Sequence, residues 1–289
     1  MSTLENRIRN EAAKLDGVPL ALSGGVDSSL LAVLIRPKFA ISVQLPGDEK
    51  YNEIQYSTLV AQHVGIKQVI VELDESKFDE DVAMAVKAIG RPIPHFNIFP
   101  LFQMYKKLAE MGETKLVVGD GPDEIMCGYG RDLIFNYLYK VYEFEAFKNY
   151  KPLIDKLLIP QALAVRAVTN MDVDTIIEAN ILMRKDMDDM SNGIAKHFGI
   201  TNFRPYQDNP ELDNFMKDLP DGQKIKDVEF GKYALREIAA KYLPHEIAWR
   251  KKKVGGPVFP VNIFKGWTET DGEFGKSKWM EYQEAILNG

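Results

Sequence analysis

Short apolar runs alternate with segments of helical periodicity over the first 130 residues of the chain. Continuous apolar runs bounded by turn residues predict buried strands over residues 18–22, 39–45, 69–73 and 115–118. Apolar positions spaced three and four apart predict helices between them, over residues 27–35, 52–64, 77–89 and 99–111. Because strands that alternate with helices form βαβ units, we predict an α/β fold with a parallel twisted sheet flanked by helices.

The pattern changes after about residue 130. Segments punctuated by proline follow without clear strand alternation, and helices are predicted over residues 132–148, 161–168, 173–184 and 228–242. We therefore predict a single domain over residues 1–289, with an α/β part over 1–130 and a mainly helical C-terminal part over 131–289. The last 25 residues contain Trp267 and Trp279, and the pattern assigns no element to them.

Composition and charge narrow the class of protein. The chain has 289 residues, of which 45% are hydrophobic and 27% charged, which is typical of a globular protein and excludes a disordered or fibrous one. Its 36 basic and 42 acidic side chains give a net charge of −6, which argues against a nucleic-acid partner. The single cysteine, Cys127, excludes an intrachain disulfide framework, and we expect it to pack as a small hydrophobic residue. With no signal-peptide core and no apolar run of roughly 18 residues, we expect a cytoplasmic protein without a membrane partner.

The strongest local signal lies between the first predicted strand and the helix that follows it. It is the segment Leu22-Ser23-Gly24-Gly25-Val26-Asp27-Ser28-Ser29. Glycines let a backbone approach a ligand closely, the amides at a helix N-terminus bind anions, and the serine hydroxyls add donors. Because Asp27 would repel a bare phosphate, the pattern indicates a phosphate site with Mg²⁺ between the two groups. The alternative is a glycine-rich turn capped by serine and aspartate, but capping a helix needs only one residue of this kind. The segment is not a Walker loop, because the lysine of that loop is missing.

This octapeptide resembles the pyrophosphate loop of the ATP pyrophosphatase superfamily, whose members split ATP between its α and β phosphates. Further segments resemble the synthetase domain shared by asparagine synthetases and β-lactam synthetases. They are residues 41–47, 118–129 and 203–208, and a C-terminal signature at 232–237, 242–244 and 249–252. The resemblance covers roughly residues 18–257 and implies an adenine nucleotide α-hydrolase-like, Rossmann-like fold.

The resemblance also implies ATP and Mg²⁺ as cofactors and gives individual residues a role. The pyrophosphate would be bound by Ser23, Gly24, Gly25, Asp27, Ser28 and Ser29, and the nucleotide would be lined by Leu22, Val43, Val118 and Gly119. Asp27 and Asp123 would hold Mg²⁺. Lys252 would stabilise developing charge, Lys232 would lie near the phosphates, and Asp120 stands where the family motif has a glutamate that engages the amine.

The reaction that the resemblance implies joins a small-molecule carboxylate to ammonia or an amine. The carboxylate attacks the α phosphate and releases pyrophosphate, and the amine then displaces AMP. Free aspartate is the default carboxylate, and a larger or intramolecular acceptor is its rival. Residue 2 is Ser2 rather than the nucleophilic cysteine of a glutaminase domain, and the phosphate loop begins at residue 23, so we expect no glutaminase domain. Nitrogen would then come from ammonia, a separate glutaminase or an amine on the substrate.

Other interpretations stay open for several of these residues. Asp123 and Glu124 follow a proline and are also favourable at a helix start. The basic run at 250–253 is also typical of a solvated surface or a nucleic-acid contact, although the Gly255-Gly256-Pro257 that follows and the spacing from Lys232 favour an active-site role. Arg204 and Arg236 are interpreted as structural ion-pair partners. For the function, the alternatives are another amidating or RNA-modifying branch of the superfamily and a non-catalytic nucleotide-binding partner of a separate glutaminase.

Overall fold

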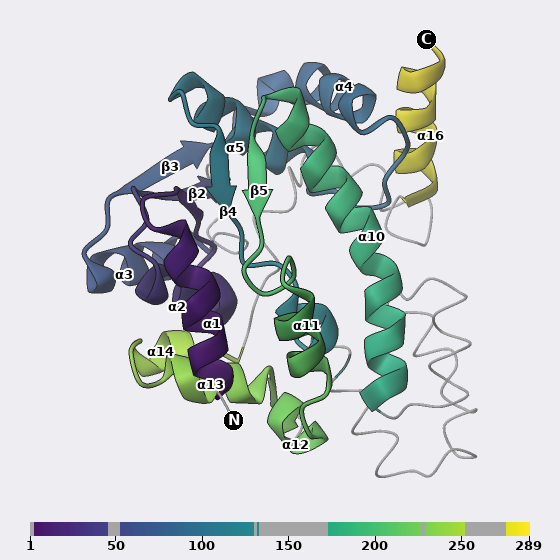
Figure 1. Ribbon diagram of the computed structural model, residues 1–289. Helices are drawn as coiled ribbons and strands as arrows, with labels where there is room; N and C mark the ends of the chain where they lie inside the picture. Colours follow the sequence, from purple (N-terminus) through teal and green to yellow (C-terminus); the bar gives the residue numbers. More distant parts are fainter. Residues whose placement is uncertain (1–2, 46–52, 130–131, 133–172, 227–228, 252–275) are drawn as a thin grey trace. The chain divides into compact units, whose positions relative to one another are not determined.

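The computed structural model describes residues 3–45, 53–129, 132, 173–226, 229–251 and 276–289 (Figure 1). Its strands are β1 (Leu20–Ala21), β2 (Ala40–Gln44), β3 (Gln68–Glu72), β4 (Lys115–Val117), β5 (Thr201–Phe203), β6 (Ile225–Lys226) and β7 (Phe230–Gly231). Its α-helices are α1 (Leu4–Ala12), α2 (Val26–Leu34), α3 (Ile54–Val64), α4 (Phe78–Ile89), α5 (Ile98–Glu110), α6 (Pro122–Ile125), α10 (Val173–His197), α11 (Pro210–Lys217), α12 (Asp221–Lys224), α13 (Tyr233–Ala239), α14 (His245–Ala248) and α16 (Lys276–Asn288). Short 3₁₀ helices are η1 (Ala13–Leu15) and η2 (Glu75–Lys77).

Strands β1 to β5 form a parallel sheet in the order β3-β2-β1-β4-β5. β2 and β3 pair along their whole length, from Ala40 opposite Gln68 to Gln44 opposite Glu72. All strands and helices predicted before residue 119 are present, and their ends lie within two residues of the predicted ends. The predicted α/β fold with a parallel sheet flanked by helices is confirmed.

Strand β5 lies in a part of the chain for which the sequence predicts no strand. It has three residues and pairs with β4, with Lys115 opposite Thr201 and Val117 opposite Phe203. So short a segment carries too little apolar alternation to be recognised on its own. Its backbone pairs with that of β4, which lies far earlier in the chain, and this pairing makes the segment a strand.

The order of the strands reverses between β1 and β4. From β1 the chain moves outward to β2 and β3 on one side, and it then returns to add β4 and β5 on the other side. Because βαβ crossovers are right-handed, this reversal places α2 and α3 on one face of the sheet and α5 on the other. Ligands of such sheets bind at the carboxyl ends of the strands, where the order reverses. The residues that leave β1 at this point are those of the predicted phosphate loop.

The chain divides into two compact units, each built from separate stretches of sequence. The first unit consists of Met1–Glu11, Gly119–Lys185 and Arg204–Lys251, and the second consists of Ala12–Val118, Asp186–Phe203 and Lys252–Gly289. We call the second the sheet unit, because β1 to β5 lie in it, and the first the ribbon unit, because it contains the two-stranded ribbon β6–β7.

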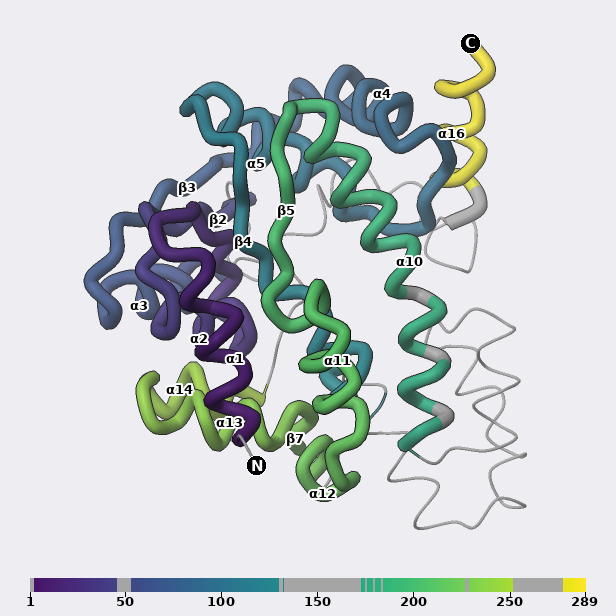
Figure 2. Tube along the Cα trace, in the orientation of Figure 1, coloured from purple at the N-terminus to yellow at the C-terminus, as the bar shows by residue number. Residues whose placement is uncertain are grey.

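The core of the sheet unit includes the C-terminal helix α16, which lies beside α4 (Figure 2). Phe78, Phe99 and Trp279 are buried in this core, with ring centroids 5.2 Å apart for Phe78 and Phe99 and 6.5 Å apart for Phe78 and Trp279. The indole nitrogen of Trp279 donates to the carbonyl of Ile93 at 2.9 Å. Part of the tail to which the sequence assigns no element is therefore a helix that completes the core.

In the ribbon unit, β6 and β7 pair antiparallel, with Ile225 opposite Gly231. The prediction of a helix over residues 228–242 is therefore wrong at its start, because α13 begins only at Tyr233. The physical reason is the residue before it. Lys232 has a φ of +55°, which does not occur inside a right-handed helix.

The helix predicted over residues 173–184 is present and continues to His197 as α10. The helices predicted over residues 132–148 and 161–168 lie outside the described residues, apart from Asp132. Within the residues that the structure describes, no helix is both long enough and apolar enough to cross a membrane.

Candidate active site

The loop between β1 and α2 is built around Gly24. Its φ is +74°, a left-handed conformation that glycine adopts without strain. A Cβ added there would lie 2.6 Å from the backbone nitrogen of Ser57 and 2.7 Å from the Cβ of Tyr56. Glycine is thus required both by the dihedral angle and by the close approach of α3. Gly25 follows with an extended backbone and caps α2.

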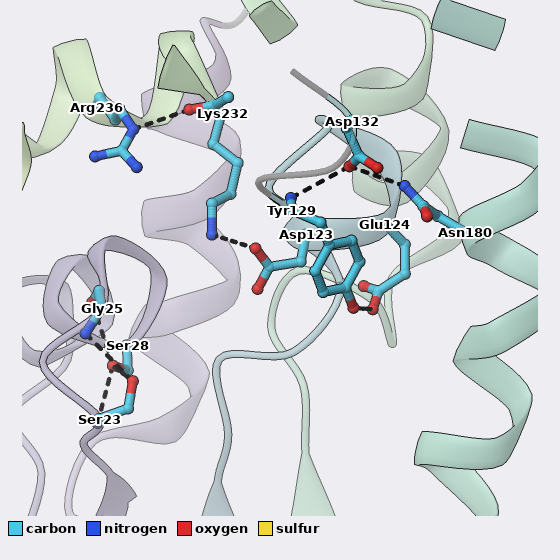
Figure 3. Close-up of polar contacts among 12 residues, drawn as sticks. Ser23, Gly25, Ser28, Asp123, Glu124, Tyr129, Asp132, Asn180, Lys232 and Arg236 are labelled. Atoms are coloured by element: carbon cyan, nitrogen blue, oxygen red, sulfur yellow. Dashed lines mark hydrogen bonds and ion pairs between the residues drawn. The ribbon is translucent and has the colours of Figure 1, made fainter. Parts of the chain in front are cut away.

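Two serines tie this loop to the first turn of α2 (Figure 3). The amide of Ser23 donates to Ser28 Oγ at 3.2 Å, the two hydroxyl oxygens lie 3.1 Å apart, and the amide of Gly25 donates to Ser23 Oγ at 3.3 Å. Ser28 Oγ lies 3.3 Å from the carbonyl of Gly25, to which it donates. The first amides of a helix have no partner within the helix and carry the positive end of its dipole. The loop therefore has the construction of an anion site.

Asp27 and Ser29 are both buried within this segment. Asp27 is 5% exposed. It is the second residue of α2, so it belongs to the first turn, at the positive end of the helix dipole. Ser29 has no exposed surface, and its hydroxyl makes no hydrogen bond with the described residues. The phosphate contact expected of Ser29 stays a prediction.

The residues expected to line the nucleotide lie on, or directly after, the strands near the point where the strand order reverses. Leu22 follows β1, Val43 lies on β2, and Val118 follows β4. Leu22 and Val118 are buried, and Val43 is half-buried. Because β1 and β4 are paired and parallel, Leu22 and Val118 leave the sheet at the same edge. Gly119, the next residue, opens the second glycine-bearing turn and belongs to the ribbon unit.

In the ribbon unit, this second turn is joined to Lys232 (Figure 3). Lys232 Nζ donates to Asp123 Oδ1 at 2.7 Å, and the lysine side chain is only 2% exposed. The positive φ of Lys232 is unusual for a residue with a side chain, and its amide is held by the carbonyl of Met126 at 2.8 Å. Gly128 leaves space for the carboxylate, because a Cβ there would collide with Asp123 Oδ1. The fold thus joins two candidate residues that lie 109 positions apart in the chain.

Asp120, the candidate acid–base residue of the same turn, is exposed over 54% of its side chain. Arg204 Nε lies 3.8 Å from Asp120 Oδ2, and Arg204 itself is buried. The interpretation of Arg204 as an ion-pair partner is therefore confirmed. Arg236 of α13 donates to the backbone carbonyls of Gly231 and Ala248, each at 2.9 Å, which links α13 to the end of β7 and to the end of α14.

Sequence reasoning missed the environment of Glu124. This residue is 7% exposed, and its carboxylate accepts a hydrogen bond from the Tyr129 hydroxyl at 2.6 Å (Figure 3). Burial, reinforced by the neighbouring charge of Asp123, raises the pKa of Glu124 to about 7. Buried carboxyl groups that titrate near neutral pH are concentrated at functional sites. The only signal in the sequence is the Pro-Asp-Glu pattern of a helix start, and that pattern does not report burial.

Three remaining expectations concern Cys127, Lys252 and the metal. Cys127 is fully buried, and burial raises the pKa of its thiol, so its predicted role as a small hydrophobic residue is confirmed. Lys252 lies outside the described residues. Across the described ranges, no group of three or more His, Cys, Asp or Glu side chains is placed to hold a metal ion.

The chain resembles known proteins over most of its length. A family model described as asparagine synthase matches residues 4–269. A Methanocaldococcus jannaschii protein, provisionally named a glutamine-hydrolyzing asparagine synthetase, is 26% identical over 268 residues, which cover 86% of this chain and 47% of the relative. The glutamine-hydrolyzing asparagine synthetase B of Escherichia coli is 23% identical over 287 residues, which cover 92% of this chain and 45% of that protein. The chain therefore spans about half the length of these two relatives.

A shorter match reaches a different group of enzymes. The NH(3)-dependent NAD(+) synthetase of Alkaliphilus oremlandii is 32% identical over 75 residues. This match covers 25% of the chain and 29% of that protein. The likeness to the NAD synthetase is therefore local, whereas the likeness to the asparagine synthetases extends along the chain.

Proposed function

Since the chain belongs to the asparagine synthase family, we propose that it forms an amide from a carboxylate in a reaction driven by ATP cleavage. First, a carboxylate oxygen attacks the α phosphorus, the bond from this phosphorus to the bridging oxygen breaks, and pyrophosphate leaves with the bonding pair. Ammonia or an amine then attacks the acyl carbon, a base takes its proton, and AMP leaves. Both steps develop negative charge on phosphate oxygens, so amide donors and cations dominate catalysis.

The observation that carries this proposal is the construction of the phosphate loop. Gly24 allows a tight approach of the backbone, and Ser23 and Ser28 tie the turn to the positive end of α2. The loop also leaves β1 at the reversal of strand order, where α/β sheets bind their ligands. These features support binding of a polyphosphate by main-chain amides, which is what splitting ATP next to its α phosphate requires.

Magnesium fits the chemistry of the candidate ligands. Mg²⁺ is commonly held by one or two carboxylates together with substrate phosphates, and Asp27 and Asp123 would supply the carboxylates. When bound, Mg²⁺ would neutralise charge on the departing pyrophosphate. The ion pair of Asp123 with Lys232 also holds an ammonium group beside the second turn, which supports a role for Lys232 near the phosphates.

The second half-reaction needs a group that takes a proton from the attacking nitrogen. We assign this role to Asp120, because its carboxylate is exposed and it stands where the family motif has its glutamate. Lys252 is assigned by resemblance to the stabilisation of charge in both steps. Asp120 is one methylene shorter than the glutamate of the family motif, so the amine or its position differs from that of the family pattern.

The direct test is ATP–pyrophosphate exchange, followed by product analysis, across a panel of carboxylates. Aspartate is the first member, followed by other dicarboxylates and the carboxylic acid that corresponds to NAD⁺. We expect one of them to support exchange and, with a nitrogen donor, to release AMP, pyrophosphate and amide in equal amounts. Formation of ADP and phosphate would contradict the proposal. ATP binding without AMP formation on any substrate would instead indicate a non-catalytic nucleotide-binding partner, and RNA-stimulated AMP formation an RNA-modifying enzyme.

A matched pair of variants shows whether the ribbon unit takes part in this step. Asp123→Asn should abolish exchange, because it removes a carboxylate assigned to Mg²⁺ and the partner of Lys232. Asp218→Asn is the control, since Asp218 is exposed at the end of α11 and has no assigned role. Equal exchange in both variants would remove Asp123 from the site.

The nitrogen donor is tested in a separate series with ammonium, free amines and glutamine. We expect ammonium or an amine to support amide formation by the 289-residue chain. Turnover on glutamine only after a glutaminase is added would support a separate partner for nitrogen transfer. Turnover on glutamine by this chain alone would show that no separate glutaminase is needed.

A further inference from the structure

A cluster of hydrogen bonds surrounds the side chain of Gln68 in the sheet unit. Gln68 is the first residue of β3 and is half-buried. Its Nε2 donates to Ser42 Oγ and to Ser57 Oγ, both at 2.9 Å, and its Oε1 accepts from Thr58 Oγ1 at 3.0 Å. One side-chain amide therefore joins β3 to β2 and to α3.

The hydroxyl protons determine which chemical group can occupy this position. Ser42 Oγ donates its proton to the carbonyl of Leu22 at 2.7 Å, and Ser57 Oγ donates its proton to the carbonyl of Ile54 at 3.0 Å. Because a hydroxyl has one proton, each serine can only accept a hydrogen bond from Gln68. The position therefore needs two N–H donors and one carbonyl acceptor on one short group. A glutamine amide meets this need, whereas an ionised glutamate of the same length has no donor.

Both branches of the cluster lead to the phosphate loop. Through Ser42, the cluster holds the carbonyl of Leu22, the residue directly before the loop. Through Ser57, it holds the part of α3 against which Gly24 packs, since the backbone nitrogen of Ser57 lies 2.6 Å from the place of a Cβ on Gly24. Gln68 thus links the strand end that leads into the loop to the helix that limits the space of its glycine.

We propose that Gln68 is a positioning residue for the phosphate loop, and that it orders the loop amides for binding of the nucleotide polyphosphate. This inference rests on the proposed function, because it assumes that the loop binds ATP. Gln68 acts through Ser42 and Ser57 and needs no contact with the nucleotide. Its loss should therefore weaken ATP binding, raise the KM for ATP and leave the KM for the carboxylate unchanged.

The first measurement is hydrogen exchange of the loop amides in the protein without nucleotide. Gln68→Ala should increase exchange in a peptide that contains Gly24 and Gly25, while exchange in α4 and α5 stays as in the wild type. Gln68→Glu keeps the length of the side chain but removes both donors, so it should behave like Gln68→Ala. Gln62→Ala is the matched control, because Gln62 is an exposed residue of α3. Equal loop exchange in all four proteins would overturn the inference.

The second measurement is calorimetric titration with ATP and Mg²⁺ in the absence of carboxylate. Loss of these hydrogen bonds should weaken ATP binding about three- to tenfold in both Gln68 variants and leave it unchanged in Gln62→Ala. If wild type and Gln68→Ala bind ATP equally well, the inference is wrong and the proposed function stands. If the wild type binds no ATP, the proposed function fails, and the exchange data on the free protein still decide whether Gln68 orders the loop.

A double-mutant cycle with Ser42→Ala tests whether the effect passes through the cluster. If Gln68 acts through Ser42, the change in ATP affinity of the double variant should be smaller than the sum of the two single changes. Full additivity of the two changes would show that the effect of Gln68 on ATP affinity does not pass through Ser42. Should Gln68→Ala fail to fold, Ser57→Ala provides the same two measurements, because it removes one acceptor of Gln68 and leaves the amide in place.

Discussion

Gly24 packs so closely against α3 that a Cβ in its place would lie 2.6 Å from the nitrogen of Ser57. Its backbone also has a positive φ, so the two constraints act on the same residue. The serines of the loop are arranged around it, with Ser23 and Ser28 hydrogen-bonded to each other. At the scale of residues, the shape of the phosphate loop therefore depends on the absence of one side chain and the presence of two short ones.

Gly24→Ala should destabilise the protein by about 2–4 kcal/mol, because a left-handed conformation and a backbone collision are penalised together. It should also lower ATP affinity at least about tenfold, since the loop must move to relieve the collision. Urea unfolding and calorimetric titration measure the two effects. Gly17→Ala separates the cost of the positive φ from the cost of the collision, because Gly17 has a φ of +79° with open space around it. Gly222→Ala, at a position with open space and no positive φ, should be neutral. Equal effects at all three positions would contradict this account.

Glu124 gives a second prediction at the scale of residues, because its carboxyl group is buried next to Asp123. Its pKa is raised from 4.5 to about 7 in the folded protein, so the folded state holds the proton more tightly than the unfolded state. Below pH 4.5 both states are protonated and ionisation has no effect on stability. Between about pH 4.5 and 7 the unfolded chain ionises first, so this group lowers stability as pH rises, and above pH 7 the penalty is constant.

Glu124→Gln should therefore stabilise the protein by about 2–3 kcal/mol at pH 8 and hardly change it at pH 4.5. The amide oxygen can still accept the hydrogen bond of Tyr129, so the main change is the loss of the ionisable group. Urea midpoints measured at both pH values, with Glu211→Gln at an exposed position of α11 as control, provide the check. A gain of the same size at both pH values would show that ionisation is not the cause.

At the scale of elements, the C-terminal helix α16 shows how a segment without a local signal becomes part of the core. Gln283 accepts from the amide of Ile93 and donates to its carbonyl, both at 2.9 Å, so its side chain pairs with the backbone as a neighbouring strand would. Trp279 fills the space beside Phe78 and Phe96, with ring centroids at 6.5 and 5.6 Å. The helix therefore stabilises the segment that joins α4 to α5.

Trp279→Ala should destabilise the protein by about 3–5 kcal/mol, because it leaves a cavity among aromatic rings. Gln283→Ala should destabilise it by about 1–3 kcal/mol, since the buried amide of Ile93 loses its acceptor and the carbonyl of Ile93 keeps only the indole of Trp279 as a donor. Thermal and urea unfolding give both values. Glu284→Ala, at an exposed position of the same helix, should change stability by less than about 0.5 kcal/mol. A neutral Trp279→Ala would mean that α16 is not part of the stable core.

At the scale of the whole molecule, the proposed function draws on groups from several distant stretches of sequence. The predicted phosphate loop comes from residues 23–29, the second glycine-bearing turn from 119–124, and Lys232 directly precedes α13. Lys252, which the resemblance assigns to both half-reactions, follows soon after. The candidate residues therefore belong to both compact units.

Lys252→Ala should reduce kcat at least about 100-fold, because it removes a cation assigned to charge that develops in the transition state. The thermal midpoint should not change. Lys251→Ala is the matched control, since Lys251 pairs with Glu229 at 2.9 Å in an exposed ion pair that contributes little. Steady-state kinetics of AMP release and thermal unfolding measure the two quantities. Retained activity in Lys252→Ala would remove this lysine from the mechanism.

The sequence by itself determined the α/β class, the strands β1 to β4, the helices between them and the position of the glycine-bearing loop between β1 and α2. These features have local signals. Apolar runs, helical periodicity and two adjacent glycines between a strand and a helix are visible within ten or so residues of each other. The resemblance of several motifs then pointed to the family that the chain belongs to.

Only the tertiary structure decided the order of the strands, the existence of β5, the docking of α16, the burial of Glu124 and the hydrogen bonds of Gln68. Each depends on groups that are far apart in the chain, such as Gln68 and Ser42, separated by 26 positions, or Ile93 and Gln283, separated by 190. Burial and hydrogen bonding are properties of neighbours in space, and a local pattern does not specify those neighbours. The sequence therefore proposes candidate residues for the chemistry, and the fold determines which groups surround and position them.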